Sequence, residues 1–261
     1  MTAPEDGLGW VEYPGLPGFK VCRLAGVRQV RIEVIDRARG PVDGDAVERR
    51  WSQMSAANPR LFDGPILSVV GFRQEGLTLC AVAERRSYKH LGVQNQVDTG
   101  TEQLSVTAVV AAVDAAGTRH ILLGRRGEGT RIYGGMWELG PSGGVDPPPP
   151  GVHAVDDGEF RRQVHAEVEE EMGGGLSVRI DGTVAVVYDP VARSYDIVVR
   201  CSAVGLVTSA AAGADTWEYR GSRWLPESEI AAFDREHAEG IIGTTRALFR
   251  CLGWVPRDTP V

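Results

Sequence analysis

The sequence predicts a mixed α/β protein in which helices flank a sheet of mixed strand direction. Apolar residues alternate with polar ones in several short segments, which is the pattern of half-buried strands. Two strongly apolar segments, 104–113 and 121–123, flank Ala115-Ala116-Gly117 and predict a hairpin. Apolar residues at helical spacing follow between Phe160 and Met172, and again near the C-terminus. Strand and helix patterns therefore share the chain.

Residues 1–100 predict a small α+β domain. Its expected elements are an irregular lead-in over 1–20, a strand at 27–34, a helix from Asp43 to Asn58, and strands at 66–73 and 77–85. Asp43 is a favourable N-cap, and Asn58-Pro59 ends the helical pattern. Gln74-Glu75-Gly76 joins the two strands as a hairpin turn. Polar and aromatic residues at 87–95 break the pattern and predict a loop that carries binding groups.

Residues 101–261 predict a second domain. After the central hairpin, its expected elements are strands at 183–188 and 195–203, a flexible patch at 209–213, a short helix from Glu227, and a C-terminal helix that buries residues between Ile241 and Leu252. Pro147-Pro148-Pro149-Pro150 predicts a stiff polyproline loop inserted ahead of an acidic helix. Residues 1–100 and 101–261 are thus the two predicted domains.

Charge and cysteine content limit the classes of function. The formal net charge is -7 and there is no basic patch, which argues against nucleic acid as a partner. An acidic protein still binds phosphates where metal ions supply positive charge. No apolar run is long enough to span a bilayer, and the four cysteines form no CxxC pair. We therefore expect reduced core thiols and a cytoplasmic protein with no membrane partner.

An acidic helix face is the most informative feature. Glu167, Glu170 and Glu171 stand at i, i+3 and i+4, so their carboxylates converge on one face of the helix. A separate apolar stripe at four-residue steps anchors the other face: Phe160, Val164, Val168 and Met172. A helix packed on one side and carrying carboxylates on the other suits hard divalent cations. The simpler interpretation is a solvated acidic face.

Two glycines upstream of this helix favour the metal interpretation. Gly143-Gly144 follow the strand-like Trp137-Glu138-Leu139, where bare backbone can approach a ligand closely. With Glu167, Glu170, Glu171 and Gly173, they resemble the Nudix box, the strand–loop–helix signature of the Nudix hydrolases. Ala166 stands where that family has an arginine, and the spacer before the helix is expanded. The resemblance covers residues 101–261 and implies the α-β-α Nudix sandwich with a mixed sheet.

A narrower resemblance begins in the first domain. Asn58-Pro59-Arg60-Leu61-Phe62-Asp63-Gly64-Pro65 and Tyr88-Lys89-His90-Leu91-Gly92 precede the expanded box. This pairing is similar to the two-domain Nudix UDP-sugar diphosphatases. It implies cleavage of the diphosphate of UDP-glucose or UDP-galactose, which gives UMP and a sugar 1-phosphate.

The resemblance also points to residues for a metal site. Mg²⁺, with Mn²⁺ as an alternative, is expected to be held by Glu167 and Glu171, together with a backbone carbonyl of Gly143-Gly144. Glu170 is expected either as a third ligand or as the group that orients the attacking water. Glu218 is expected to serve a metal or a proton.

Five further residues are candidates for substrate binding. Phe62 and Tyr88 are expected on the two faces of a uracil, because aromatic rings stack on bases. The competing interpretation is a core phenylalanine and a surface tyrosine. Arg126, with Arg125 as the second choice, is expected to clamp the diphosphate through its planar fork, unless both arginines are simply solvated. Glu138 is expected to accept hydroxyls of the sugar or ribose.

Two alternative functions stay open. The first is a Nudix hydrolase of ADP-ribose or of another nucleoside diphosphate derivative. The second is a Nudix-fold sensor that binds a nucleotide sugar without cleaving it, which Ala166 and the expanded spacer favour. A small-molecule nucleotide is the expected ligand in each case, and the oligomeric state is open.

Overall fold

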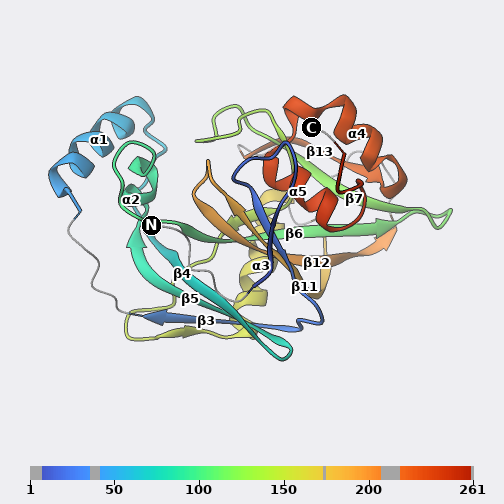
Figure 1. Cartoon of the computed structure of the whole chain (residues 1–261), viewed down its shortest axis with the longest axis horizontal. Helices are drawn as coiled ribbons and strands as arrows, with labels where there is room; N and C mark the ends of the chain where they lie inside the picture. Colours follow the sequence, from blue (N-terminus) through green and yellow to red (C-terminus); the bar gives the residue numbers. More distant parts are fainter. Residues whose placement is uncertain (1–7, 36–41, 173–174, 207–217, 260–261) are drawn as a thin grey trace.

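A computed structural model of the chain describes residues 8–35, 42–172, 175–206 and 218–259. Within these residues, thirteen strands are hydrogen-bonded into one mixed sheet, and helices pack on it (Figure 1). The predicted α/β class is therefore confirmed. The predicted flexible patch at 209–213 and Gly173 lie outside the described residues.

The strands are β1 (Trp10–Glu12), β2 (Lys20–Arg23), β3 (Gln29–Ile35), β4 (Pro65–Glu75), β5 (Thr78–Ser87), β6 (Gln103–Val113), β7 (Arg119–Arg126), β8 (Trp137–Leu139), β9 (Ser142–Gly144), β10 (Ala154–Val155), β11 (Val178–Asp189), β12 (Ser194–Leu206) and β13 (Tyr219–Pro226). The helices are α1 (Gly44–Ala57), α2 (Tyr88–Val93), α3 (Asp157–Met172), α4 (Ile230–Glu236) and α5 (Gly243–Cys251), with short 3₁₀ turns η1 (Glu227–Glu229) and η2 (Ala238–Gly240).

Local signals explain the front elements that the sequence predicts correctly. Asp43 caps α1 by accepting a hydrogen bond from the Ala46 N–H at 2.9 Å, and the helix ends at Asn58. β4 and β5 pair antiparallel around a turn in which Gly76 has a positive φ of 59°. The helix and the hairpin therefore form where the capping and turn residues predict them.

Two local predictions were wrong. Residues 1–20 are not wholly irregular, because Trp10–Glu12 and β2 pair as a hairpin whose connection turns at glycines with positive φ. Residues 88–93 form the short helix α2 where a loop was expected. The Asp63 carboxylate accepts the Lys89 N–H at 3.0 Å, and Leu91 and Val93, two residues of the helix, are buried. Tertiary contacts therefore order this segment.

β6 is the strand on which the sheet is assembled. It runs parallel to β12 and antiparallel to β7 and β9, and it meets β4 at the pair Ser68–Gln103. β11, β2 and β1 extend the sheet beyond β12, while β5, β3 and β10 extend it beyond β4. In Figure 1, β6, β12 and β11 cross the middle of the molecule, and β4, β5 and β3 lie to one side.

Helices cover both faces of the sheet around β6. α3 packs its predicted stripe, Phe160, Val164, Val168 and Met172, against the even-numbered apolar residues of β6. α4 and α5 pack on the opposite face, over Val109 and Ala111 of β6. Ile241 and Ile242 are buried but precede α5, so the C-terminal helix begins later than expected. The part of the chain around β6 is an α-β-α sandwich.

Strands cross between the two predicted domains in both directions. β2, from residues 1–100, pairs with β11 of the second half, and β10, from residues 101–261, pairs with β3 of the first. We call the described part of residues 1–100 the front unit. α3 also contacts it, because Asp157 accepts the Val30 N–H at 2.9 Å and Phe160 shares a core cluster with Ile32. The division at residue 100 stays a prediction.

The proline-rich insert between β9 and α3 is anchored on the front unit. Arg85 donates through one guanidinium nitrogen, Nη2, to the carbonyl oxygens of Pro149 (3.1 Å) and Val152 (2.9 Å). The insert then pairs as β10 with β3, and the Val34 N–H donates to the His153 carbonyl at 2.9 Å. The chain thus touches the front unit immediately before it enters the acidic helix.

Two further predictions concern the whole chain. The four cysteines, Cys22, Cys80, Cys201 and Cys251, are buried and free, as expected. Over the described ranges, no helix is long and apolar enough to cross a membrane.

Candidate active site

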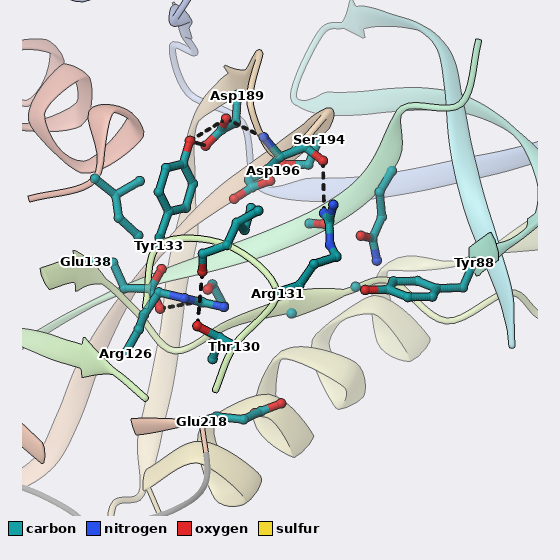
Figure 2. A pocket seen from close by; sticks show the side chains of 18 of the residues that line it. Tyr88, Arg126, Thr130, Arg131, Tyr133, Glu138, Asp189, Ser194, Asp196 and Glu218 are labelled. Atoms are coloured by element: carbon teal, nitrogen blue, oxygen red, sulfur yellow. Dashed lines mark hydrogen bonds and ion pairs between the residues drawn. The ribbon is translucent and has the colours of Figure 1, made fainter. Parts of the chain in front are cut away.

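A cavity of about 380 Å³ lies where the front unit meets the sheet around β6. Its walls come from the 58–62 segment after α1, from Tyr88, from the 129–133 loop after β7, from β9, and from the connection between β11 and β12. Figure 2 shows the side chains that point into it. Segments that are far apart in the sequence therefore line one cavity.

The acidic helix presents two of its three predicted carboxylates to β9. Glu171 accepts the Ser142 N–H at 2.9 Å and is buried. Glu167 lies directly against Gly143, because a Cβ built on that glycine would sit 2.2 Å from the Glu167 carboxyl carbon. Glu170 is exposed on the same helix, although its charge acts on Glu167. Ser142 and Gly143 line the cavity, which brings the helix face to its edge.

The carboxylates raise one another's proton affinity. Burial raises the pKa of Glu167 to about 7, and the negative charges of Glu170 and Glu218 add to the shift. Burial, with the charge of Glu138, likewise raises the pKa of Glu171, while the Ser142 N–H opposes the shift. Burial also raises the pKa of Glu218, against a hydrogen bond with Glu171 and the charge of Arg126. The protein therefore stabilises the ionised form of these carboxyls poorly, chiefly because they are buried.

This cluster has the donor chemistry of a magnesium site. Its ligand atoms are carboxylate oxygens, which hard divalent cations prefer, and its excess negative charge is what such a cation would offset. Among the residues the structure describes, no three His, Cys, Asp or Glu side chains are already gathered closely enough to hold a metal ion. Glu167, Glu171 and Glu218 therefore fit a divalent cation in donor chemistry, but their side chains would have to move closer together to hold one. The exposed Glu170 lies one helical turn from Glu167.

Arg126 and Glu138 form the wall beside the cluster. Arg126 Nη1 and Glu138 Oε1 are 2.8 Å apart, and the Tyr219 hydroxyl donates to the same oxygen at 2.6 Å. Arg126 Nε is buried and has no hydrogen-bond partner in the described part of the chain. Arg125 instead donates to the Gly135 carbonyl at 3.0 Å and lies over the Trp137 ring. Of the two predicted arginines, the structure brings only Arg126 into the cavity.

Two aromatic side chains from the front unit form another part of the wall. Phe62 lines the cavity with 78% of its surface exposed, so its interpretation as a core residue was wrong. Tyr88 also lines the cavity, and its ring meets that of Trp51 edge to face, with centroids 6.1 Å apart. Both rings have surface available to a ligand.

The sequence interpretation missed the polar floor and the far wall of the cavity. They include Gln103, Ser105, Arg131, Tyr133, Asp189 and Asp196. A usable signal was present, since polar residues alternate with apolar ones at the start of β6 and of β12. That alternation marks one face of each strand as polar, but only the pairing of β6 with β12 gathers these residues into one surface.

Comparisons with known proteins give similarity in structure alone. No protein-family model and no curated protein matches the chain. Solved structures that share part of the fold include a MutT protein from Methanosarcina mazei Go1, at 24% identity over 57% of this chain and 91% of that one, with a TM-score of 0.39. A Nudix hydrolase from Alicyclobacillus acidocaldarius covers 59% of this chain and 91% of its own at 17% identity, with a TM-score of 0.42.

DR0079 from Deinococcus radiodurans covers more of the chain. It matches 72% of this chain and 99% of its own at 15% identity, with a TM-score of 0.43. Similarities at these TM-scores do not assign the chain to a family. The function is therefore argued from the site itself.

Proposed function

We propose that this protein is a Nudix-type pyrophosphohydrolase that cleaves the diphosphate of a UDP-sugar, such as UDP-glucose or UDP-galactose, to UMP and a sugar 1-phosphate. The observation that carries the proposal is the set of mutually repelling carboxylates, the buried Glu171 and the half-buried Glu167 and Glu218, beside a cavity into which Arg126 points. A guanidinium and a divalent cation both bind diphosphate oxygens well, and this end of the cavity offers the first and has ligands for the second.

Glu167, Glu171 and Glu218, with Gly143 and Glu170 as further candidates, would hold Mg²⁺ or Mn²⁺. The ion supplies positive charge for the phosphate oxygens and lowers the pKa of a bound water. Acidic ligands also explain how a chain of net charge -7 binds an anionic substrate.

The chain's own groups then have separate tasks. Arg126 binds phosphate oxygens through the guanidinium face that Glu138 leaves open, since Glu138 occupies Nη1 alone. Water adds its oxygen to one phosphorus, the P–O–P bridge breaks on that side, and the bridging oxygen leaves with the other phosphate. Glu170, the exposed carboxylate one helical turn from Glu167, is our candidate for the group that orients the water and accepts its proton.

The front unit supports a nucleotide as the ligand. Phe62 and Tyr88 offer ring surface within the same cavity, and stacking on an aromatic ring is worth about 1–3 kcal/mol per base. We also propose that the substrate is a small molecule and that the protein has no nucleic-acid partner. The four free, buried thiols support a cytoplasmic location, where cysteines stay reduced.

Hydrolysis assays test this function. Purified protein is incubated with UDP-glucose, UDP-galactose and ADP-ribose, with Mg²⁺ or with EDTA, and the products are separated. We expect UMP and sugar 1-phosphate only with the metal. Glu171→Gln should lower kcat/KM by at least about 100-fold. Glu169→Gln, an exposed position on the same helix, should leave it unchanged.

Two results would contradict the proposal. Cleavage of ADP-ribose with UDP-glucose untouched would reject the substrate class and keep the hydrolase. Wild-type protein that binds UDP-glucose and never cleaves it, with Glu170→Gln binding equally well, would reject the enzyme and indicate a sensor.

A further inference from the structure

The polar floor of the cavity is a row of side chains that crosses three strands. Asp196 of β12 pairs with Ser105 of β6, and Ser105 pairs with Gly144 of β9. Neighbouring strands lie about 4.8 Å apart, so Asp196 stands roughly 10 Å from Gly144 along this row. The floor therefore links the glycine pair beside the acidic helix to a carboxylate on the far side of the cavity.

Two aspartates line that far side, and their hydrogen bonding differs. Asp189 receives the Tyr133 hydroxyl on both oxygens, at 2.8 and 2.9 Å, and the N–H groups of Val191 and Ala192, each at 2.8 Å. It orders the turn between β11 and β12, and its acceptor capacity is used.

Asp196 keeps an acceptor free. The Thr107 hydroxyl donates to its Oδ2 at 2.9 Å, and the Ser194 hydroxyl lies close enough to lower the pKa of the carboxyl, whereas no group in the described parts of the chain reaches the buried Oδ1 with hydrogen-bond geometry. A buried acceptor without a partner destabilises the folded protein unless a ligand supplies the missing donor. Burial raises the pKa of Asp196 to about 6, so the group is mostly an ionised acceptor at neutral pH.

Figure 2 separates the polar groups of the cavity into three regions. Arg126 and Glu138 lie at the left with Glu218 below them, Tyr88 lies at the right, and Asp189 and Asp196 lie at the top. A nucleotide sugar also has three parts. The first region suits the diphosphate and the second suits the base, which leaves the third for the sugar.

We propose that Asp196 recognises the glycosyl group of the substrate by accepting a hydrogen bond from one of its hydroxyls. The inference rests on the proposed function and goes beyond it, because it names the residue that makes the site select a nucleotide sugar over a free nucleotide. A carboxylate that holds no cation repels phosphate and accepts hydroxyls well, so Asp196 suits a hydroxyl better than a phosphate. The remaining competitor is an N–H of the base, and the experiment separates the two.

Binding measurements without turnover test the role of Asp196. UDP-glucose and UMP are titrated calorimetrically into wild-type protein and into Asp196→Ala and Asp196→Asn in EDTA. We expect Asp196→Ala to weaken UDP-glucose by about 10- to 100-fold and UMP by less than about twofold. Asp196→Asn, which keeps an acceptor oxygen, should lose less. Asp181→Asn, on neighbouring β11 and outside the cavity, is the matched control and should change neither affinity.

Equal weakening of UDP-glucose and UMP would overturn the proposal, because Asp196 would then contact the nucleotide. Unchanged binding of both ligands to Asp196→Ala would overturn it as well. The hydrolysis assay with Mg²⁺ is scored separately. Wild-type protein that cleaves UDP-glucose while Asp196→Ala binds it normally rejects this inference alone. A protein that never cleaves UDP-glucose, yet shows the selective loss, rejects the enzyme and keeps Asp196 as the sugar contact.

Discussion

At the scale of single residues, the contact between Gly143 and Glu167 sets the position of the acidic helix. The carboxyl of Glu167 occupies the space that a side chain at residue 143 would need. On the next helical turn, Glu171 is tied to the Ser142 N–H. These two contacts fix where the carboxylates meet the cavity, so a single added methyl group is a direct probe of the site.

Gly143→Ala should lower activity without unfolding the protein. Its Cβ would lie 2.2 Å from the Glu167 carboxyl carbon and would push that side chain aside. A displacement of about 1 Å at a catalytic group costs about 100-fold in rate, so we expect a comparable loss in kcat/KM. Gly221→Ala is the control, since nothing lies within 4 Å of a Cβ there. Full activity of Gly143→Ala would show that Glu167 is not held in a required position.

The raised pKa of Glu167 predicts a pH-dependent stability in metal-free buffer. Its folded pKa is about 7 against an ordinary 4.5, so the folded state binds the proton more tightly than the unfolded state. The free energy of unfolding should therefore fall as pH rises from about 4.5 to about 7, by at most about 3 kcal/mol. Urea unfolding at several pH values, with EDTA, measures this change.

Glu167→Gln should reduce that dependence, leaving the part due to Glu171 and Glu218, and Glu169→Gln should leave it as in the wild type. Parallel pH profiles for the wild type and Glu167→Gln would mean that the Glu167 carboxyl titrates at an ordinary value in the folded protein.

At the scale of elements, the insert between β9 and α3 is a structural connection. Its expansion separates the glycines from the acidic helix in sequence, and the structure uses the added residues to reach β3 and Arg85. The entry to α3 is thereby held from the front unit as well as from β9.

Arg85→Ala should destabilise the protein by about 1–2 kcal/mol, because it removes two charge-assisted hydrogen bonds to the insert. Equilibrium unfolding in urea measures the change, and cleavage by a protease near Pro149 should become faster. Arg179→Ala removes an exposed arginine with an ion pair to Asp181 and should cost less than about 1 kcal/mol. Equal effects of the two substitutions would show that the insert is not anchored through Arg85.

Elements with local signals were predictable from the sequence, and those fixed by distant contacts were not. α1 carries its own cap at Asp43, and the apolar stripe of α3 has helical spacing, so both were found. α2 was missed because Asp63, a residue 26 positions from Lys89, orders it. Asp196 was missed because its role depends on Thr107, which is 89 positions away and comes near only through the pairing of β12 with β6.

At the scale of the whole molecule, one core cluster joins residues from both predicted domains. Ile32 and Leu67 from the front unit pack in the same cluster as Phe160 and Val164 of α3. β2 likewise supplies the neighbour of β11. The two halves therefore depend on each other for burial of apolar surface and for strand pairing.

The fragment 101–261 should not fold cooperatively by itself. Removing residues 1–100 takes away the part of the core cluster that Ile32 and Leu67 supply beside α3, and it leaves β11 without β2. We expect a broad thermal transition by circular dichroism and poor dispersion of amide resonances, whereas the whole chain should melt sharply. A sharp transition for the fragment would support residues 101–261 as an independent domain.

The pairing of β10 with β3 has a consequence for how a ligand enters and leaves the cavity. Opening of the cavity by a hinge would need one flexible connection between the front unit and the sheet around β6, but the chain between Gly144 and α3 is also attached to the front unit through β3 and Arg85. Phe62 lines the cavity with 78% of its surface exposed, so a change of its rotamer can alter access to the cavity without separating these elements.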